Sequence, residues 1–215
     1  MQDESELLIG ARGWEHPAWC GDFYPDDLPE DWRLTYYANE FMSVLLPAER
    51  WIDAREEAVE EWCDSVHDRF TFFLELPGGE GAVEDLPVRL KAVAAVMGDL
   101  LKGVLWPPAA SEQGLEACRA ALPGGTFYRG SSQADLPEGV SAFRCLDGAD
   151  DASADLLLLD PGACGDLRQL RALLEWFDAG RYQGCAGGLF VVGDAPPVVE
   201  RIREIETLSQ LLGIA

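Results

Sequence analysis

The chain has 215 residues, of which 48% are hydrophobic and 10% aromatic, and its formal net charge is −23. This length and composition exclude a disordered chain and predict a single folded domain over residues 1–215. The charge also argues against nucleic acid or an anionic membrane as a partner, because phosphate groups are bound by clustered Lys and Arg, and the only lysines are Lys91 and Lys102.

The sequence shows no sign of a membrane anchor or an export signal. No apolar run approaches the ~18 residues of a transmembrane helix, and the acidic start lacks the basic and then apolar pattern of a signal peptide. We therefore expect a cytoplasmic protein. The six cysteines form no Cys-x-x-Cys motif, so free thiols in a reducing compartment are the expectation. The acidic, lysine-poor composition fits either salt adaptation or a GC-rich genome, and the first alternative predicts that added salt stabilises the fold.

Short apolar runs alternate with helical patterns along the chain. Several runs are apolar on both faces, as in Leu156–Leu159, which is typical of parallel strands covered by helices. The predicted strands are Leu7–Gly10, Met42–Leu46, Phe70–Leu76, Gly103–Trp106, Gly125–Arg129, Val140–Leu146, Asp155–Asp160 and Gly188–Gly193.

Helical periodicity is clearest in three segments, Leu86–Leu101, Leu167–Phe177 and Val198–Leu212. Alternating strands and helices imply right-handed crossovers and a parallel sheet. Segments 131–138 and 147–154 are too short for a full helix. We therefore predict an α/β fold, a compact (β/α)8 TIM-like barrel of parallel strands in which the helices after strands five and six are shortened or missing.

Residues 8–41 combine a short strand, a Gly13-Trp14 turn, the loop Trp19-Cys-Gly-Asp-Phe-Tyr-Pro25 and an amphipathic helix. This stretch resembles the opening of the YecE-like family, a group of TIM-barrel proteins of unknown function. Segments 100–108 and 190–197 resemble the fourth and eighth strand regions of that family more weakly. The resemblance implies a TIM barrel and leaves the activity open.

The chain departs from the family pattern where a TIM barrel places its chemistry, at the C-terminal ends of the strands. The family usually has Thr-Ser after the first strand's Gly, Glu and Asn at the end of strand two, Lys on strand three, Glu on strand five and paired Asn on strand eight. Those positions are held here by Ala11-Arg12, Leu45 and Pro47, Glu75, Phe127, and Gly193-Asp194. Arg129 is the polar residue that matches the family on strand five.

Polar and aromatic residues near the strand ends are the candidate ligand-binding residues. They are Arg12, Trp14, His16, Glu75, Tyr128, Arg129, Arg144, Asp160 and Asp194. Arginines among carboxylates suit a small anion, His16 suits acid–base chemistry near neutral pH, and aromatic side chains in the first loop suit a sugar-like ligand. The competing interpretation is a set of ion pairs, loop caps and packing contacts.

No catalytic residue, cofactor or metal is assigned from these patterns. Glu75, Asp160, Asp194 and His16 contain metal-ligand atoms, but their spacing does not demand a metal. For Arg129 we expect an inward-pointing side chain paired with Glu75 or Asp160, because a buried guanidinium needs a partner.

Two functions remain open at this point. The first is a divergent, non-catalytic or ligand-binding barrel with a rewritten mouth. The alternative is a hydrolase or isomerase that acts on a small anionic or sugar-like substrate at the C-terminal face.

Overall fold

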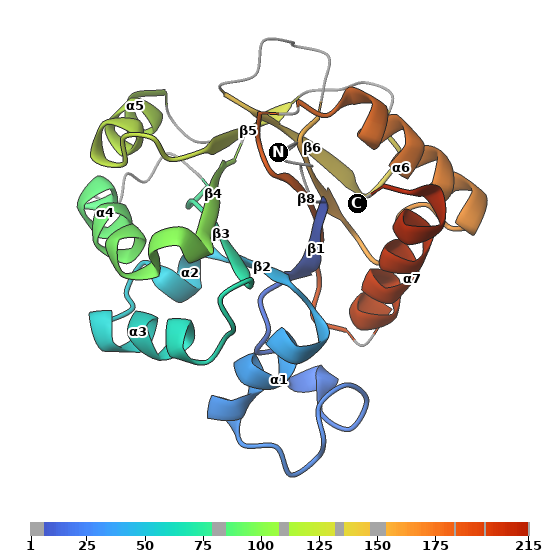
Figure 1. Cartoon of the computed structure of the whole chain (residues 1–215), viewed down its shortest axis with the longest axis horizontal. Coiled ribbons are helices and arrows are strands. Elements are labelled where there is room, and N and C mark those ends of the chain that lie inside the picture. Colours follow the sequence, from blue (N-terminus) through green and yellow to red (C-terminus); the bar gives the residue numbers. More distant parts are fainter. Residues whose placement is uncertain are drawn as a thin grey trace.

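A computed structural model describes residues 7–78, 85–107, 112–131, 136–146, 154–182, 184–195 and 197–214. In these residues, eight strands close into a barrel in the order of the sequence (Figure 1). They are β1 Leu7–Arg12, β2 Ser43–Leu46, β3 Thr71–Glu75, β4 Leu101–Trp106, β5 Phe127–Ser131, β6 Val140–Cys145, β7 Leu156–Leu159 and β8 Gly187–Val191. All eight predicted strands and the predicted TIM-like barrel class are confirmed.

Helices surround the barrel (Figure 1). The α-helices are α1 Arg33–Glu40, α2 Ala48–Trp51, α3 Glu56–Asp64, α4 Leu86–Met97, α5 Glu112–Ala121, α6 Leu167–Gly180 and α7 Pro197–Leu212. Short 3-10 turns are η1 Pro17–Trp19, η2 Glu30–Trp32 and η3 Gly98–Leu100. The described residues between β5 and β6 and between β6 and β7 contain no helix, in line with the prediction for these connections.

The prediction that all strands are parallel is wrong at β6, which runs antiparallel to both β5 and β7. The neighbouring pairs elsewhere in the barrel are parallel. The reason is the length of the two connections, residues 132–139 and 146–155. A parallel crossover needs about a dozen residues or more, whereas an antiparallel pair needs only a turn. The reversal puts the end of β6 at the bottom of the barrel.

Two apolar layers hold the fold together. Inward-facing side chains fill the barrel, with Leu45, Phe73, Leu105, Tyr128 and Phe190 among them. A larger cluster lies between the strands and the helices. A TIM barrel is a packed core and not a pore, so a ligand has to bind at the rim, where the strands end.

A disulfide joins Cys145 and Cys185 at the bottom of the barrel, so the expectation of free thiols is wrong for this pair. The reversed β6 carries Cys145 to the place where the chain enters β8. The buried carboxylate of Asp155 fixes the same corner, because it accepts hydrogen bonds from the backbone N–H groups of Cys145 (2.7 Å) and Tyr182 (2.6 Å). The cysteines at 20, 63, 118 and 164 are free thiols. No helix in the described part of the chain is long and apolar enough to span a membrane.

Candidate functional site

Arg12 and Glu75 meet at the mouth of the barrel. They are the last residues of β1 and β3. Side chains alternate along a strand. Arg12 lies four positions beyond the inward-facing Leu8, and Glu75 lies two positions beyond the inward-facing Phe73, so both point into the barrel. Arg12 Nε donates to Glu75 Oε2 at 2.6 Å, and Arg12 Nη2 donates to Glu49 Oε1 at 3.2 Å. Burial alone would lower the pKa of Arg12, but the charges of Glu75 and Glu49 and their hydrogen bonds together outweigh burial, and the net shift is upward.

Arg12 and Glu75 are two of the positions at which the sequence departs from the pattern that it resembles. The structure pairs these two residues with each other. The side chains are 31% and 21% exposed, so the pair lies partly buried at the C-terminal mouth, where the substrates of TIM-barrel enzymes usually react.

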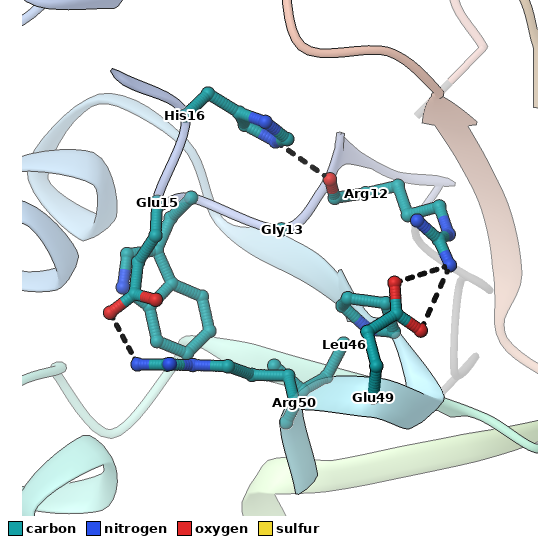
Figure 2. A pocket seen from close by; sticks show the side chains of 9 residues that line it. Arg12, Gly13, Glu15, His16, Leu46, Glu49 and Arg50 are labelled. Carbon is teal, nitrogen blue, oxygen red and sulfur yellow. Dashed lines mark hydrogen bonds and ion pairs between the residues drawn. The ribbon is translucent and has the colours of Figure 1, made fainter.

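A pocket of about 320 Å³ lies beside this pair, between the loops that follow β1 and β2 (Figure 2). This volume falls within the ~300–1,000 Å³ of small-molecule sites. We call it the β1–β2 pocket. Its lining consists of Arg12, Gly13, Trp14, Glu15, His16, Leu46, Pro47, Glu49 and Arg50.

Arg50 forms one wall of the β1–β2 pocket. Its guanidinium donates to Glu15 (Figure 2) and lies 5.8 Å from the ring centroid of Trp14 and 5.6 Å from that of Trp62. The two indoles pack edge to face at 5.7 Å. Trp14 is only 3% exposed, so it supports the wall and does not offer a free face on which a sugar would stack. Packing of the first loop against α3 explains the position of Trp14.

His16 folds back over the strand end. Its Nε2 lies 2.9 Å from the carbonyl oxygen of Arg12 (Figure 2). A carbonyl only accepts, so Nε2 carries the proton and Nδ1 of the neutral ring is a proton acceptor. Burial lowers the pKa of His16, although the Arg12 carbonyl and the charge of Asp194 oppose the shift. The ring is therefore neutral at pH 7.

Glycine at position 13 permits this turn. Gly13 has a φ of +80°, and an added Cβ would lie 3.3 Å from His16 Nε2. Side chains with a Cβ rarely adopt this backbone conformation. The Gly-Trp turn seen in the sequence thus positions both His16 and Trp14.

The charges at the β1–β2 pocket do not favour an anion. In its lining, Arg12 and Arg50 contribute +2 and Glu15 and Glu49 contribute −2, which leaves no net charge with a neutral His16, and the nearby Glu75 adds one negative charge. Each arginine is bound by at least one carboxylate. Such a lining offers many donors and acceptors and little net charge, which suits an uncharged polar molecule better than an anion.

The structure does not bring the three candidate arginines together. Arg129 follows the inward-facing Tyr128, points toward the helix layer and binds Glu112 of α5, so the expected partners Glu75 and Asp160 were wrong. Arg144 lies on the reversed β6, directly opposite Arg129 in the ladder. Its neighbours on β6, Phe143 and Cys145, face inward, so the Arg144 side chain faces outward.

Tyr128 lies in the barrel interior, away from the β1–β2 pocket. Its hydroxyl donates to the carbonyl of Ala186 at 2.7 Å, just before β8 begins. Burial raises its pKa, and the charge of Asp155 adds to the shift. Its role is therefore to tie β5 to the bottom of the barrel.

The two candidate aspartates occupy exposed loops. Asp160 opens the turn after β7, where its carbonyl accepts from the N–H of Ala163 at 2.9 Å. Asp194 lies between β8 and α7, close enough to His16 to influence its pKa. Among the described residues, no three His, Cys, Asp or Glu side chains come together as a metal site would require.

Sequence reasoning missed Glu49 and Arg50 as site residues. They follow β2 at the start of α2, where its N-terminal turn faces the β1–β2 pocket. Their position shortly after a predicted strand could have identified them, because the same criterion identified the candidate residues after β1.

The fold and the pocket define a barrel protein of the TIM-like class with a rim site on its first two strands. Residues 8–102 match the family model "Protein of unknown function DUF72", which is less than half of the chain. No functionally curated protein matches the sequence at a significant level.

Solved structures of DUF72 proteins share the fold. A DUF72 family protein from Thermotoga maritima MSB8 is 14% identical, with a TM-score of 0.64 over 95% of this chain and 99% of that chain. A DUF72 family protein from Enterococcus faecalis V583 is 12% identical, with a TM-score of 0.59 over 95% of each chain. At these identities the likeness establishes the barrel fold only, and the function has to be argued from the site.

Proposed function

We propose that this chain is a divergent YecE-like barrel that binds a small, sugar-like molecule in the β1–β2 pocket and does not catalyse a reaction. The observation that carries the proposal is the pocket of about 320 Å³ at the rim, which lies beside the mouth residues Arg12 and Glu75, whose charges are already paired with each other. A polyhydroxylated ligand exchanges hydrogen bonds with the ion-paired Arg and Glu side chains without adding charge.

An uncharged ligand is preferred over a small anion on electrostatic grounds. An anion in the β1–β2 pocket meets two guanidiniums that Glu15, Glu49 and Glu75 already bind, and the chain as a whole carries −23. Both terms oppose the approach of negative charge. The same charge argues against nucleic acid and anionic membranes as partners, and we place the protein in the cytoplasm as part of this proposal.

Calorimetric titration with neutral monosaccharides, matched against their phosphate and carboxylate derivatives, tests the proposal. We expect a neutral sugar to bind and its charged derivative to bind more weakly. Glu49→Gln, at a side chain that is 69% exposed, should weaken the binding by about tenfold or more, because a hydrogen bond to a charged group contributes ~1.5–3 kcal/mol.

Glu175→Gln is the matched control, since Glu175 forms an exposed pair with Arg171 on α6, away from the pocket. It should leave sugar binding unchanged. Stronger binding of the charged derivatives, or equal losses in both variants, would refute the proposed ligand class.

A hydrolase or isomerase that acts on the same class of molecule is the second candidate, and one observation favours it. His16 is neutral with Nδ1 as a proton acceptor, which is the state that a general base needs. Turnover of nitrophenyl glycosides and isomerisation of aldoses would test it. An enzyme should lose turnover in His16→Gln and keep sugar binding, whereas the binding proposal predicts no turnover in either protein.

A further inference from the structure

His16 is the lining residue of the β1–β2 pocket whose ordinary pKa lies nearest to neutral pH. The other ionisable residues of the lining are glutamates and arginines, namely Glu15, Glu49, Arg12 and Arg50. Residues of these two types ordinarily keep one charge state between pH 5 and pH 8. Protonation of His16 therefore changes the charge of a lining that is otherwise constant over this range.

The two histidines of the chain differ in their hydrogen bonds. In His67, Nε2 lies 3.1 Å from the carbonyl oxygen of Ala38, and Nδ1 accepts from the backbone N–H of Arg69 at 3.3 Å. Among the described residues, His16 forms a hydrogen bond through Nε2 only, to the carbonyl oxygen of Arg12. A proton added at Nδ1 of His16 leaves intact the bond that holds the ring in the pocket wall, whereas at His67 it breaks the bond from Arg69.

The groups around the His16 ring come from three places in the fold. Arg12 ends β1, Asp194 lies between β8 and α7, and the ring of Trp19 in η1 packs at 4.5 Å between ring centroids. Burial lowers the pKa of His16 below its ordinary value of 6.5, and the charge of Arg12 adds to this shift. The charge of Asp194 and the backbone of Arg12 and Gly13 oppose the shift without cancelling it. The ring is therefore neutral at pH 7 and gains its proton in acidic solution.

We infer that His16 sets the charge preference of the β1–β2 pocket, so that the neutral ring favours an uncharged sugar and the protonated ring admits a sugar acid; this rests on the proposed function and adds a pH-dependent choice of ligand to it. The lining has no net charge while His16 is neutral, and protonation makes it +1. Glu75 and Asp194 lie nearby in both states and offset part of this charge, but the step of one unit remains. A positive ring favours a bound carboxylate, and by linkage the carboxylate favours the proton on the ring.

Calorimetric titration of the full chain with glucuronate and with its uncharged amide, glucuronamide, tests the inference, because the two probes differ only at the group that carries the charge. At pH 8 the amide should bind and glucuronate should bind more weakly. From pH 8 to pH 5 the affinity for glucuronate relative to the amide should rise by about tenfold, the effect of one charge at a partly screened site. Titrations at pH 6 in buffers of different ionisation enthalpy should show proton uptake when glucuronate binds and little or none when the amide binds.

Two variants assign the effect to one histidine. His16→Gln has an amide that can donate to the Arg12 carbonyl but cannot take up a proton in this range, so its preference for the amide probe should stay nearly constant from pH 8 to pH 5, without proton uptake. His67→Gln is the matched control and should behave like the wild type. Thermal melts check that both variants are folded, and the wild-type titrations stand without them.

The outcomes separate the inference from the proposed function. If glucuronamide binds at pH 8 but the preference of the wild type does not change with pH, the inference is overturned and the proposed function stands. An equal pH dependence in His16→Gln would assign the effect to the carboxylates and would also overturn the inference. If neither probe binds at either pH, the proposed function and the inference fall together.

Discussion

The two halves of the barrel differ in strand direction and in the connections between their strands. Each strand from β1 to β4 is parallel to its neighbours and is followed by a helix, whereas β5, β6 and β7 form an antiparallel run without intervening helices in the described residues. Because β6 is reversed, it presents its first residue, Val140, at the rim and not its last one. The first half therefore supplies most of the strand-end loops from which a TIM barrel builds a site, and the β1–β2 pocket lies there.

The sequence match and the pocket fall in the same half. The DUF72 match ends at residue 102, before β5 begins. The reversed segment is instead tied down at the bottom of the barrel by the disulfide and by Asp155. On the proposed function, the first half carries the binding site, and the β5–β7 run closes the sheet.

The largest expected effect is a loss of stability on removing the disulfide that ties β6 to the segment before β8. Cys145→Ser removes a cross-link between positions that are 40 residues apart, and the chain-entropy relation gives a loss of ~4 kcal/mol in the free energy of unfolding. Urea unfolding of the oxidised protein should show this loss, and dithiothreitol should destabilise the wild type but not the variant. Cys20→Ser, at an exposed free thiol, is the control. A wild type that is insensitive to reduction would contradict the prediction.

The next effect concerns the mouth in the first half. Arg12→Met leaves Glu75 unpaired at 21% exposure, and we expect a loss of about 2 kcal/mol in the free energy of unfolding. The double variant Arg12→Met/Glu75→Leu should recover part of that loss, because it leaves no lone charge. A double-mutant cycle by urea unfolding measures the coupling. Additive losses would show that the pair contributes little to stability.

Most of the fold was predictable because it depends on local patterns. Apolar runs and helical periodicity located the strands and the long helices α4, α6 and α7. Strand direction could not be predicted from these patterns, because the apolar pattern of a strand is the same for a parallel and an antiparallel neighbour. The lengths of the connections 132–139 and 146–155 contained that information, since neither can hold a crossover. The disulfide was not predictable, because it depends on the reversal of β6.

The site was predictable only in part. Strand-end position correctly grouped Arg12, Trp14, His16 and Glu75 near the mouth, because those ends lie on one rim. The same reasoning was wrong for Arg129. Two apolar residues, Phe127 and Tyr128, precede it, and the sequence does not show which of the two side chains faces inward. The side chain of Tyr128 faces inward, so alternation sends Arg129 outward.

A smaller effect on stability comes from the titration of Glu206 on α7, which lies near Glu40 at the end of α1. Burial, together with the charge of Glu40, raises the pKa of Glu206 to about 7, against the opposing charge of Arg203. A folded pKa above the unfolded value of ~4.3 means that the folded state binds the proton more tightly. This contribution is complete below pH ~4.3 and is lost as the pH rises through 7.

We therefore expect Glu206→Gln to be more stable than the wild type at pH 8, by about 1 kcal/mol after allowance for solvent screening. The two proteins should converge at about pH 4, below the unfolded pKa of ~4.3, and thermal melts from there to pH 8 measure the difference. Glu200→Gln, at an exposed position on the same helix, is the control. A constant difference between pH 5 and pH 8 would rule out titration of Glu206 as the cause.

The smallest expected loss of stability is that of Arg129→Met, because the side chain of Arg129 points outward, whereas that of Arg12 points into the barrel. Arg129 and Glu112 are 41% and 64% exposed, and exposed ion pairs contribute at most ~0.5–1 kcal/mol. Arg129→Met should therefore cost much less stability than Arg12→Met and should leave sugar binding at the β1–β2 pocket unchanged, because its side chain faces α5. Urea unfolding and calorimetric titration of both variants make the comparison. Equal losses of stability in the two variants, or weakened sugar binding in Arg129→Met, would mean that β5 contributes to the site and that the binding function is not confined to the first half of the barrel.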